Sequence, residues 1–175
     1  THPDPAIRMR AALAPSGVAT ADLLAAAVGE PVVGVRDALV LALARQPDIV
    51  EVAVARLEDP DPTVREVLVR TLGKLRNPAC LPALARRLDD TEPAVVAAAL
   101  DALGRIGDPA AAPALAALLG GGRASVRDVT DALVALGPEA VAAVAERLGD
   151  PDAAVGEHAT EVLERLGADP GLTFT

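Results

Sequence analysis

One pattern returns along this sequence at nearly fixed spacing, and it constrains the fold more than any other feature. The marker is an aliphatic residue, most often followed by arginine. It occurs at Ile7-Arg8, Val35-Arg36, Val64-Arg65, Val95-Val96, Val126-Arg127 and Val155-Gly156, at intervals of 28, 29, 31, 31 and 29 residues. A second aliphatic series keeps the same period, at Val28, Leu57, Leu88, Leu119 and Leu148. The chain is therefore predicted to be an array of similar units.

Apolar residues inside a unit follow the helical period twice. Val64, Val67 and Leu68 begin a first series spaced i, i+3, i+4, and Leu81 and Leu84 begin a second one. Glycine and proline separate the two series, because glycine permits a left-handed helix cap and proline suits the first turn of a helix. Linkers rich in aspartate and proline join successive units, and their carboxylates can cap the next helix. Each unit is therefore predicted to be a helical hairpin.

The units are predicted to span 3–29, 30–58, 59–89, 90–120, 121–149 and 150–175, and the last is reduced to one helix and a tail. A single hairpin leaves its apolar face exposed, whereas stacked hairpins bury it. Hydrophobic residues make up 51% of the chain but aromatic residues only 1%, which suits thin, closely packed helices better than sheets. We expect one all-α domain over residues 1–175, a right-handed α-solenoid of about five to six hairpins, standing alone or as part of a longer chain.

Charge and cysteine content restrict the partners and the compartment. Sixteen Lys and Arg against 25 Asp and Glu give a net charge of −9, which disfavours nucleic acid. The single cysteine, Cys80, excludes an intrachain disulfide, and no segment resembles a signal peptide, so a cytoplasmic location is predicted. The longest uncharged stretch, residues 109–122, is too short to span a bilayer, so no membrane contact is expected.

Two runs, residues 57–90 and 88–120, carry a resemblance to a known family. Both combine a D-x-x-x-x-V start, a turn of the A-L-G-x-I-G-D-P type and a P-A-L helix. In these features they resemble the HEAT-like repeats of the phycobilisome-lyase type. The resemblance implies an α-solenoid whose second helices line a concave face. The match is weaker at the ends, where unit six has Gly156 in place of the arginine and unit one lacks the Leu-Gly turn.

Recurrent arginines form the first candidate set. They follow the aliphatic marker at Arg8, Arg36, Arg65 and Arg127. An anion-binding ladder is one interpretation. The resemblance implies the other, in which each arginine bonds carboxylates or carbonyls of a neighbouring unit, a task that suits the bidentate guanidinium. We therefore interpret these residues as a structural arginine ladder.

The second candidate set is a strip along the second helices, hereafter the strip, on the face that the resemblance makes concave. It combines small apolar residues with guanidinium groups. Its members are Val52, Arg56, Ala83, Arg86, Arg87, Ala114, Leu118, Ala143 and Arg147. An acidic or amphipathic peptide suits such a surface. The alternative is that these arginine stems merely cover alanine in solvent.

Four further features have a structural explanation beside a functional one. The glycine run 120–122 lacks the strand and the Lys-Ser or Lys-Thr pair of a phosphate-binding loop, so a flexible linker is favoured. Cys80 is expected to fill a packing slot rather than to react. His158 is expected to be a partly exposed residue of the last unit rather than a metal ligand, because no second histidine and no cysteine lies near it in sequence. The acidic pairs of the linkers lack EF-hand spacing and are interpreted as helix caps.

The leading functional hypothesis is a non-catalytic protein–protein interaction scaffold that binds a protein or peptide on the strip. The alternative, implied by the resemblance, is a tetrapyrrole (bilin) lyase subunit or a chaperone-like HEAT-repeat protein. An enzyme resembling the alkylpurine DNA glycosylases would need a basic channel with aromatic residues, which this acidic chain does not provide. We expect no catalytic residues, metal or other cofactor, and self-association through the faces of the terminal repeats is the other partner hypothesis.

Overall fold

The computed structural model describes residues 2–14 and 17–168, and in these ranges it contains helices and turns but no strand. In chain order the helices are α1 (Pro5–Leu13), α2 (Thr20–Val28), α3 (Val33–Leu43), α4 (Ile49–Arg56), α5 (Pro62–Leu75), η1 (Pro78–Cys80), α6 (Leu81–Ala85), η2 (Arg86–Asp89), α7 (Pro93–Ile106), η3 (Pro109–Ala111), α8 (Ala112–Ala116), α9 (Val126–Leu136), η4 (Gly137–Ala140), α10 (Val141–Ala145) and α11 (Ala153–Arg165). The elements labelled η are 3₁₀ turns. The predicted all-α class is confirmed.

The linkers start the first helices by side-chain capping. Asp4, Asp61 and Asp152 each accept a hydrogen bond from the backbone N–H two residues further on, at 2.8–3.0 Å. Such caps satisfy donors that a helix cannot pair internally. Pro5 and Pro62 occupy the first helical position, where the missing N–H costs nothing.

The second helices of the middle units are shorter than the sequence period indicates. The helix from Pro78 to Asp89, for example, consists of η1, α6 and η2, with one α-helical turn between two 3₁₀ turns. Pro78 and Pro82 have no backbone N–H, so this helix lacks two of its hydrogen-bond donors. The long helices of the array are therefore the first helices, such as α5 and α7 with 14 residues each.

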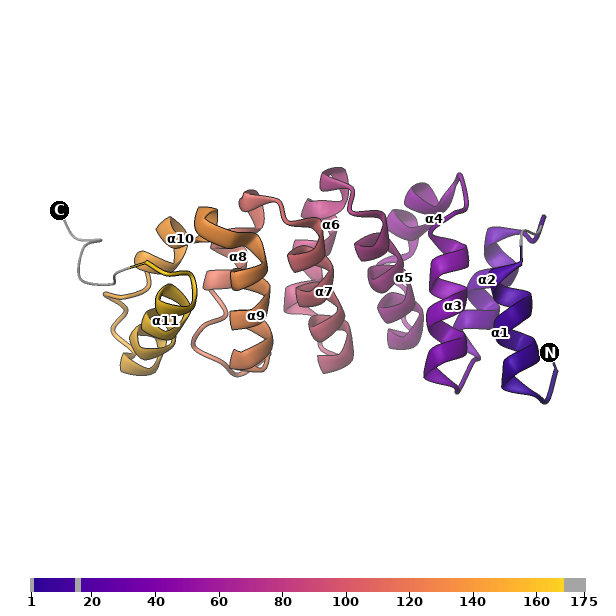
Figure 1. Ribbon diagram of the computed structural model, residues 1–175, viewed down its shortest axis with the longest axis horizontal. Coiled ribbons are helices and arrows are strands. Elements are labelled where there is room, and N and C mark those ends of the chain that lie inside the picture. Colours follow the sequence, from indigo (N-terminus) through magenta and orange to yellow (C-terminus); the bar gives the residue numbers. More distant parts are fainter. Residues whose placement is uncertain (1, 15–16, 169–175) are drawn as a thin grey trace.

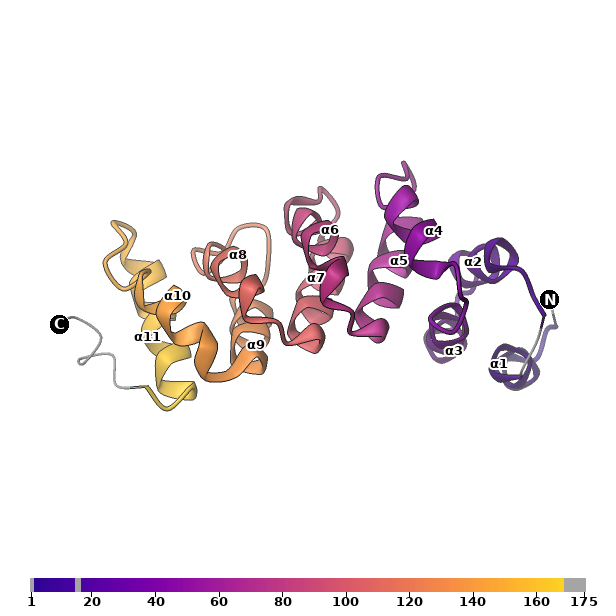
Figure 2. The ribbon, with the colours of Figure 1, turned by 90° about the horizontal axis from the view of Figure 1, so that it is seen from above.

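The helices form two layers in a single row that runs from the N-terminal to the C-terminal end (Figure 1). One layer holds the first helices α1, α3, α5, α7, α9 and α11, and the other holds α2, α4, α6, α8 and α10 (Figure 2). The middle of the row stands higher than its two ends in Figure 2, so the row is arched with the first helices on its inner side. This α-solenoid therefore carries its second helices on the outer side, in contrast to the expectation that they line the concave face.

Close contacts between first helices explain the direction of the arch. A Cβ atom added to Gly73 of α5 would lie 2.8 Å from the Cβ of Ala102 in α7, so only glycine fits there. A Cβ atom added to Gly104 of α7 would lie 3.4 Å from the Ala132 Cα of α9, an ordinary van der Waals contact, so this approach is close but does not require glycine. Small residues let these backbones approach closely, whereas the second helices stand further apart on the outer side (Figure 2).

Packing pairs each second helix with the first helix that follows it. α2 packs on α3, α4 on α5, α6 on α7, α8 on α9 and α10 on α11. The core between them is aliphatic, and Leu43, Leu68, Leu84 and Leu133 are fully buried in it. No helix in the described part of the chain is both long and apolar enough to span a membrane.

Candidate interaction surfaces and the arginine clamps

Two of the predicted ladder arginines bond across a unit boundary, and a third bonds within its own unit. The Arg8 guanidinium donates to both oxygens of Glu30 at 2.7 and 2.9 Å, and Glu30 begins the next unit. Arg65 contacts Asp90 in the same bidentate way, at 2.9 and 2.7 Å. Arg36 instead donates to the backbone carbonyl of Glu30 at 3.0 and 2.8 Å. These arginines are occupied by the protein itself and are not free to hold an anionic ligand.

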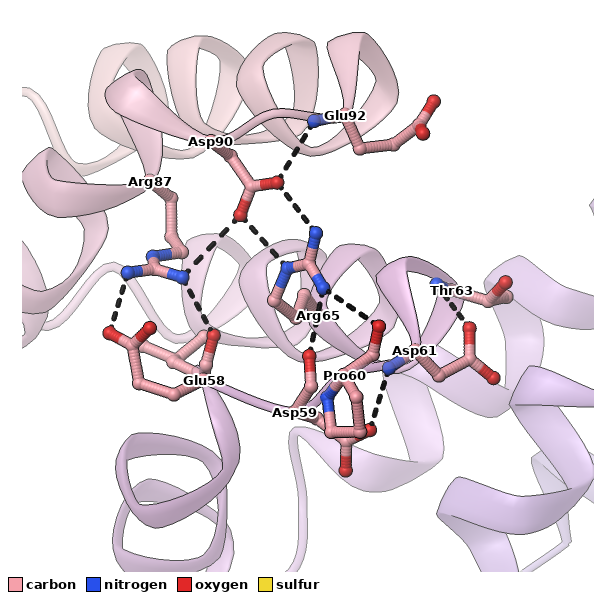
Figure 3. A network of polar contacts seen from close by, with 10 residues as sticks. Glu58, Asp59, Pro60, Asp61, Thr63, Arg65, Arg87, Asp90 and Glu92 are labelled. Atoms are coloured by element: carbon pink, nitrogen blue, oxygen red, sulfur yellow. Dashed lines mark hydrogen bonds and ion pairs between the residues drawn. The ribbon is translucent and has the colours of Figure 1, made fainter.

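The carboxylate of Asp90 is shared by two arginines (Figure 3). Besides the bonds from Arg65, it accepts one from Arg87 at 3.4 Å. Arg87 also donates to the Leu57 carbonyl at 2.9 Å and to Glu58 at 2.6 Å. The side chains of Arg65 and Arg87 are each 11% exposed and that of Asp90 is 3% exposed. We call this group, Arg65, Arg87 and Asp90, the arginine clamp.

The guanidinium of Arg65 also sets the protonation of the clamp. Its hydrogen bonds hold the pKa of Asp90 below the usual value, and the same bonds raise the pKa of Arg65. In the first unit the hydrogen bonds from Arg8 and from the Val32 N–H lower the pKa of Glu30 to about 2. Glu30 therefore stays charged down to strongly acidic pH in the folded protein, and Asp90 holds its charge to a lower pH than a free aspartate does.

This charge predicts acid sensitivity. The pKa of Glu30 in the fold lies below its usual value near 4.5, so protonation favours the unfolded chain. The stabilisation is complete above about pH 4.5 and is lost as the pH falls towards 2. We expect the melting temperature to drop over this interval and Glu30→Gln to flatten the drop, as measured by circular dichroism at a series of pH values. An equally steep acid limb in Glu30→Gln would contradict the assignment.

The strip arginines turn out to be engaged rather than open. Arg56 contacts Asp59 and Arg147 contacts Asp150, each at 2.7 Å and each three residues further along the chain. With Arg87 and Asp90, these pairs share the pattern Arg-Leu-x-Asp. That pattern is visible in the sequence and would have identified the pairing. Of the four strip arginines, only Arg86 is exposed without an ion pair among the described residues.

The apolar members of the strip are half-buried between units. Ala83, Ala114, Leu118 and Ala143 pack against the core, and Val52 is also half-buried. Together with the engaged arginines, this leaves the strip with little free surface. Its position on the outer layer removes the concave shape on which the binding interpretation depended (Figure 2).

The junction between the fourth and fifth units lacks the counterpart of every clamp residue. Val96 replaces the arginine of the first helix, Leu118 that of the second helix, and Gly121 the aspartate of the linker. Val96 is buried and Leu118 packs against the core. The joint replacement has a physical reason, because an arginine kept here without its carboxylate would be a buried unpaired charge.

Arg127 does not join the ladder. Its side chain is 87% exposed, and its nearest carboxylate oxygen, on Asp131, is 3.9 Å away. The marker residue is the third residue of α5 and α7, but Val126 is the first residue of α9. Val126 is only half-buried, whereas Val64 and Val95 are buried, so the start of α9 packs less closely than its counterparts and Arg127 faces solvent.

The remaining candidates have structural roles or no partner in the described ranges. Cys80 is 1% exposed, and burial raises the pKa of its thiol, so it is a packing residue. The Nδ1 atom of half-buried His158 lies 2.8 Å from the carbonyl oxygen of Leu119. Gly121 and Gly122 adopt positive φ angles of 78° and 91°, which explains glycine in this linker. No cluster of His, Cys, Asp or Glu suited to a metal occurs in residues 2–14 and 17–168.

A groove that the sequence did not identify lies on the inner layer between α7 and α9. It has a volume of about 740 Å³. Its floor consists of small residues, including Ala97, Gly104 and Ala135, and charged residues stand at its rim. The rim residues are Arg76, Asp101, Arg105, Asp128 and Asp131. The sequence signal for this groove was a series of small residues at helical spacing in α7 and α9. The close contact between Gly104 and α9 accounts for only part of that series.

Ion pairs occupy part of this rim. Asp101 pairs with Arg105 at 2.6 Å and Asp131 with Arg165 at 2.8 Å. Asp128 is exposed and has no ion pair among the described residues. The groove is lined by three carboxylates and two guanidinium groups, so its net charge is negative. It is therefore suited to bind a partner segment with basic or mixed-charge side chains.

Comparison with known proteins agrees with this architecture. Residues 50–134 match the family model for HEAT repeats. A chain in the complex of CpcE and CpcF of phycocyanin lyase from Nostoc sp. PCC7120 has a similar fold, with a TM-score of 0.59. The two sequences are 24% identical, and the match covers 90% of this chain and 68% of that chain. No curated protein matches the chain by sequence.

Proposed function

We propose that this HEAT-repeat protein works by binding another protein along the inner layer of its solenoid, without catalysis of its own. The observation that carries the proposal is the groove between α7 and α9, which is open, has a floor of small residues and is edged by charge. Solenoids commonly recognise partners through such extended inner surfaces. The strip is less suitable, because Arg87 and Arg147 are held by Asp90 and Asp150.

The test reverses charge at the groove rim. Asp101→Lys combined with Asp128→Lys places two cations where a basic segment would dock, and both side chains are exposed, so the fold is kept. We expect the amount of partner retained from host lysate to fall on the order of tenfold. The matched control is Glu139→Lys with Glu146→Lys, which makes the same charge change on exposed residues of the outer layer. Equal retention by both double variants would exclude the groove.

A subunit of a tetrapyrrole (bilin) lyase, or a chaperone-like relative of one, is the second candidate. The fold similarity to a chain of the CpcE–CpcF complex supports it. That structure is of a two-protein complex, so this candidate also involves a protein partner. The two candidates differ in one readout: a lyase subunit, alone or with its captured partner, alters the visible absorbance of an added linear tetrapyrrole, whereas an adaptor leaves it unchanged.

A further inference from the structure

The residue that follows α5 is an arginine in a backbone conformation that later units reserve for glycine. Arg76 has φ 50° and ψ 36°, and it is the only residue other than glycine with a positive φ in the part of the chain that the structure describes. The equivalent residues after α7, α9 and α11 are Gly107, Gly137 and Gly167, with φ between 70° and 76°. A side chain is strained at positive φ, whereas glycine is not. The third unit therefore keeps this arginine at a cost to its own stability.

The dipole of α5 does not account for Arg76. A cation near the C-terminus of a helix is favoured by the helix dipole. Lys74 already supplies that cation in the last turn of α5, as Arg105 does in α7, and α7 is followed by Gly107 rather than by a second cation. The side chain of Arg76 is exposed and makes no ion pair with another described residue. Strain at such a residue indicates a role in binding rather than in stability.

The position of Arg76 connects this strain to the groove between α7 and α9. Although Arg76 follows α5, it lines the groove together with Arg105 and Gly107 at the C-terminal end of α7. Arg105 is held by Asp101 of its own helix at 2.6 Å. Arg76 is therefore the guanidinium group of the groove that has no carboxylate partner among the described residues.

The opposite side of the groove carries an unpaired carboxylate. Asp131 of α9 contacts Arg165, but the exposed Asp128, in the first turn of α9, has no ion pair within the described ranges. α7 packs against both α5 and α9, so Arg76 and Asp128 stand on opposite sides of α7. The two unpaired charges of the groove thus have opposite signs and separate positions.

We propose that Arg76 binds an aspartate or glutamate side chain of the protein that occupies the groove, an inference that rests on the proposed function. The bound segment carries both charges, with its acidic residue at Arg76 and a basic residue at Asp128. A guanidinium group can hold a carboxylate through two parallel hydrogen bonds, as Arg65 holds Asp90 inside this chain. Opposite charges at two separate positions also fix the direction in which the segment lies.

A nucleic acid is a poor occupant of the same groove. Its phosphate groups would be attracted to Arg76 but repelled by the three carboxylates that line the groove. A protein segment of mixed charge meets both signs favourably.

Arg76→Gly distinguishes a binding role from a structural one, because its two expected effects have opposite signs. The substitution relieves the strained backbone, so the melting temperature should rise by about 2–4 °C. It also removes the partner of the acidic side chain, so the amount of protein retained from host lysate should fall on the order of tenfold. Arg76→Lys keeps the charge and should recover part of the retention. Arg86→Ala removes an exposed arginine of the outer layer and should leave retention unchanged.

A zero-length crosslink identifies the group that position 76 contacts. Lys74 is the only lysine of the sequence, so Arg76→Lys combined with Lys74→Arg places the single side-chain amine at position 76. A carbodiimide couples this amine to a contacting carboxylate of the bound protein in host lysate, and peptide mass spectrometry locates the linked residue. We expect links to Asp or Glu in a segment that also contains Lys or Arg. Arg86→Lys with Lys74→Arg is the matched control and should give no link to that segment.

Three results would overturn the proposal. The first is unchanged retention by a folded Arg76→Gly chain, and the second is a fall in its melting temperature, which would make the arginine a stabilising residue. The third is the absence of any link from position 76 to an acidic side chain of the retained protein. The groove itself stands if Asp101→Lys with Asp128→Lys still reduces retention. If that double variant is also without effect, the proposed function fails together with this inference.

Discussion

Asp90→Ala is expected to lower the free energy of unfolding by about 3 kcal/mol, because it leaves the largely buried guanidinium of Arg65 without a carboxylate and removes one of the two carboxylates that Arg87 contacts. Arg65 and Arg87 both donate to this side chain, and neither is more than 11% exposed. The measurement is urea denaturation followed by circular dichroism at neutral pH.

The neighbouring aspartate provides the control. Asp89 is 76% exposed and pairs with the exposed Arg123, so Asp89→Ala should cost at most about 1 kcal/mol. A triple variant, Arg65→Val with Arg87→Leu and Asp90→Gly, copies the fourth unit and should recover part of the loss, since no buried charge remains. If Asp90→Ala costs no more than Asp89→Ala, the clamp does not stabilise the fold.

Leu84→Ala should cost roughly 2–5 kcal/mol, since it removes a fully buried side chain from a close-packed core and leaves a cavity. Leu84 lies in α6, which packs on α7, so the loss loosens the joint between the third and fourth units. The same denaturation experiment measures it.

An exposed residue of another second helix provides the control for Leu84. Val54 in α4 is 48% exposed, and Val54→Ala should change the free energy of unfolding by no more than about 0.5 kcal/mol. Similar losses in the two variants would mean that the inward face of the second helices has been assigned incorrectly.

The helices could be predicted because their signals are local. The spacing of Val64, Val67 and Leu68 repeats within one helix, and caps such as Asp61 lie next to the helix they start. The buried positions of the second helices followed from the same period, as Leu84 illustrates. Each of these features depends on residues a few positions apart, which a sequence displays directly.

The layer on the inner side of the arch could not be predicted in the same way. It depends on how closely α5 and α7 approach, and that distance is set by Gly73 meeting Ala102. Both residues look unremarkable in sequence, because their effect appears only when the helices are stacked. The binding strip was therefore assigned to the concave face, whereas its helices form the outer layer.

The pairing of side chains between units was the second feature that could not be predicted from the sequence. Arg87 reads as a solvent-facing cation in its own helix, yet it reaches the Leu57 carbonyl of the preceding unit. Arg127 follows a valine as Arg65 does, but that valine is half-buried rather than buried, and Arg127 faces solvent. The exposure of such an arginine depends on how the start of its helix packs, which the local sequence does not display.

The missing clamp of the fourth unit bears on how the array comes apart in acid. The Arg8–Glu30 contact and the clamp at Asp90 weaken when their carboxylates take up protons. The joint between α7 and α9 uses Gly104 against Ala132 and has no carboxylate at the position of Asp90, because Gly121 stands there. Protonation therefore removes a contact from the joints at Glu30 and Asp90, whereas the joint between α7 and α9 has no contact of this kind to lose.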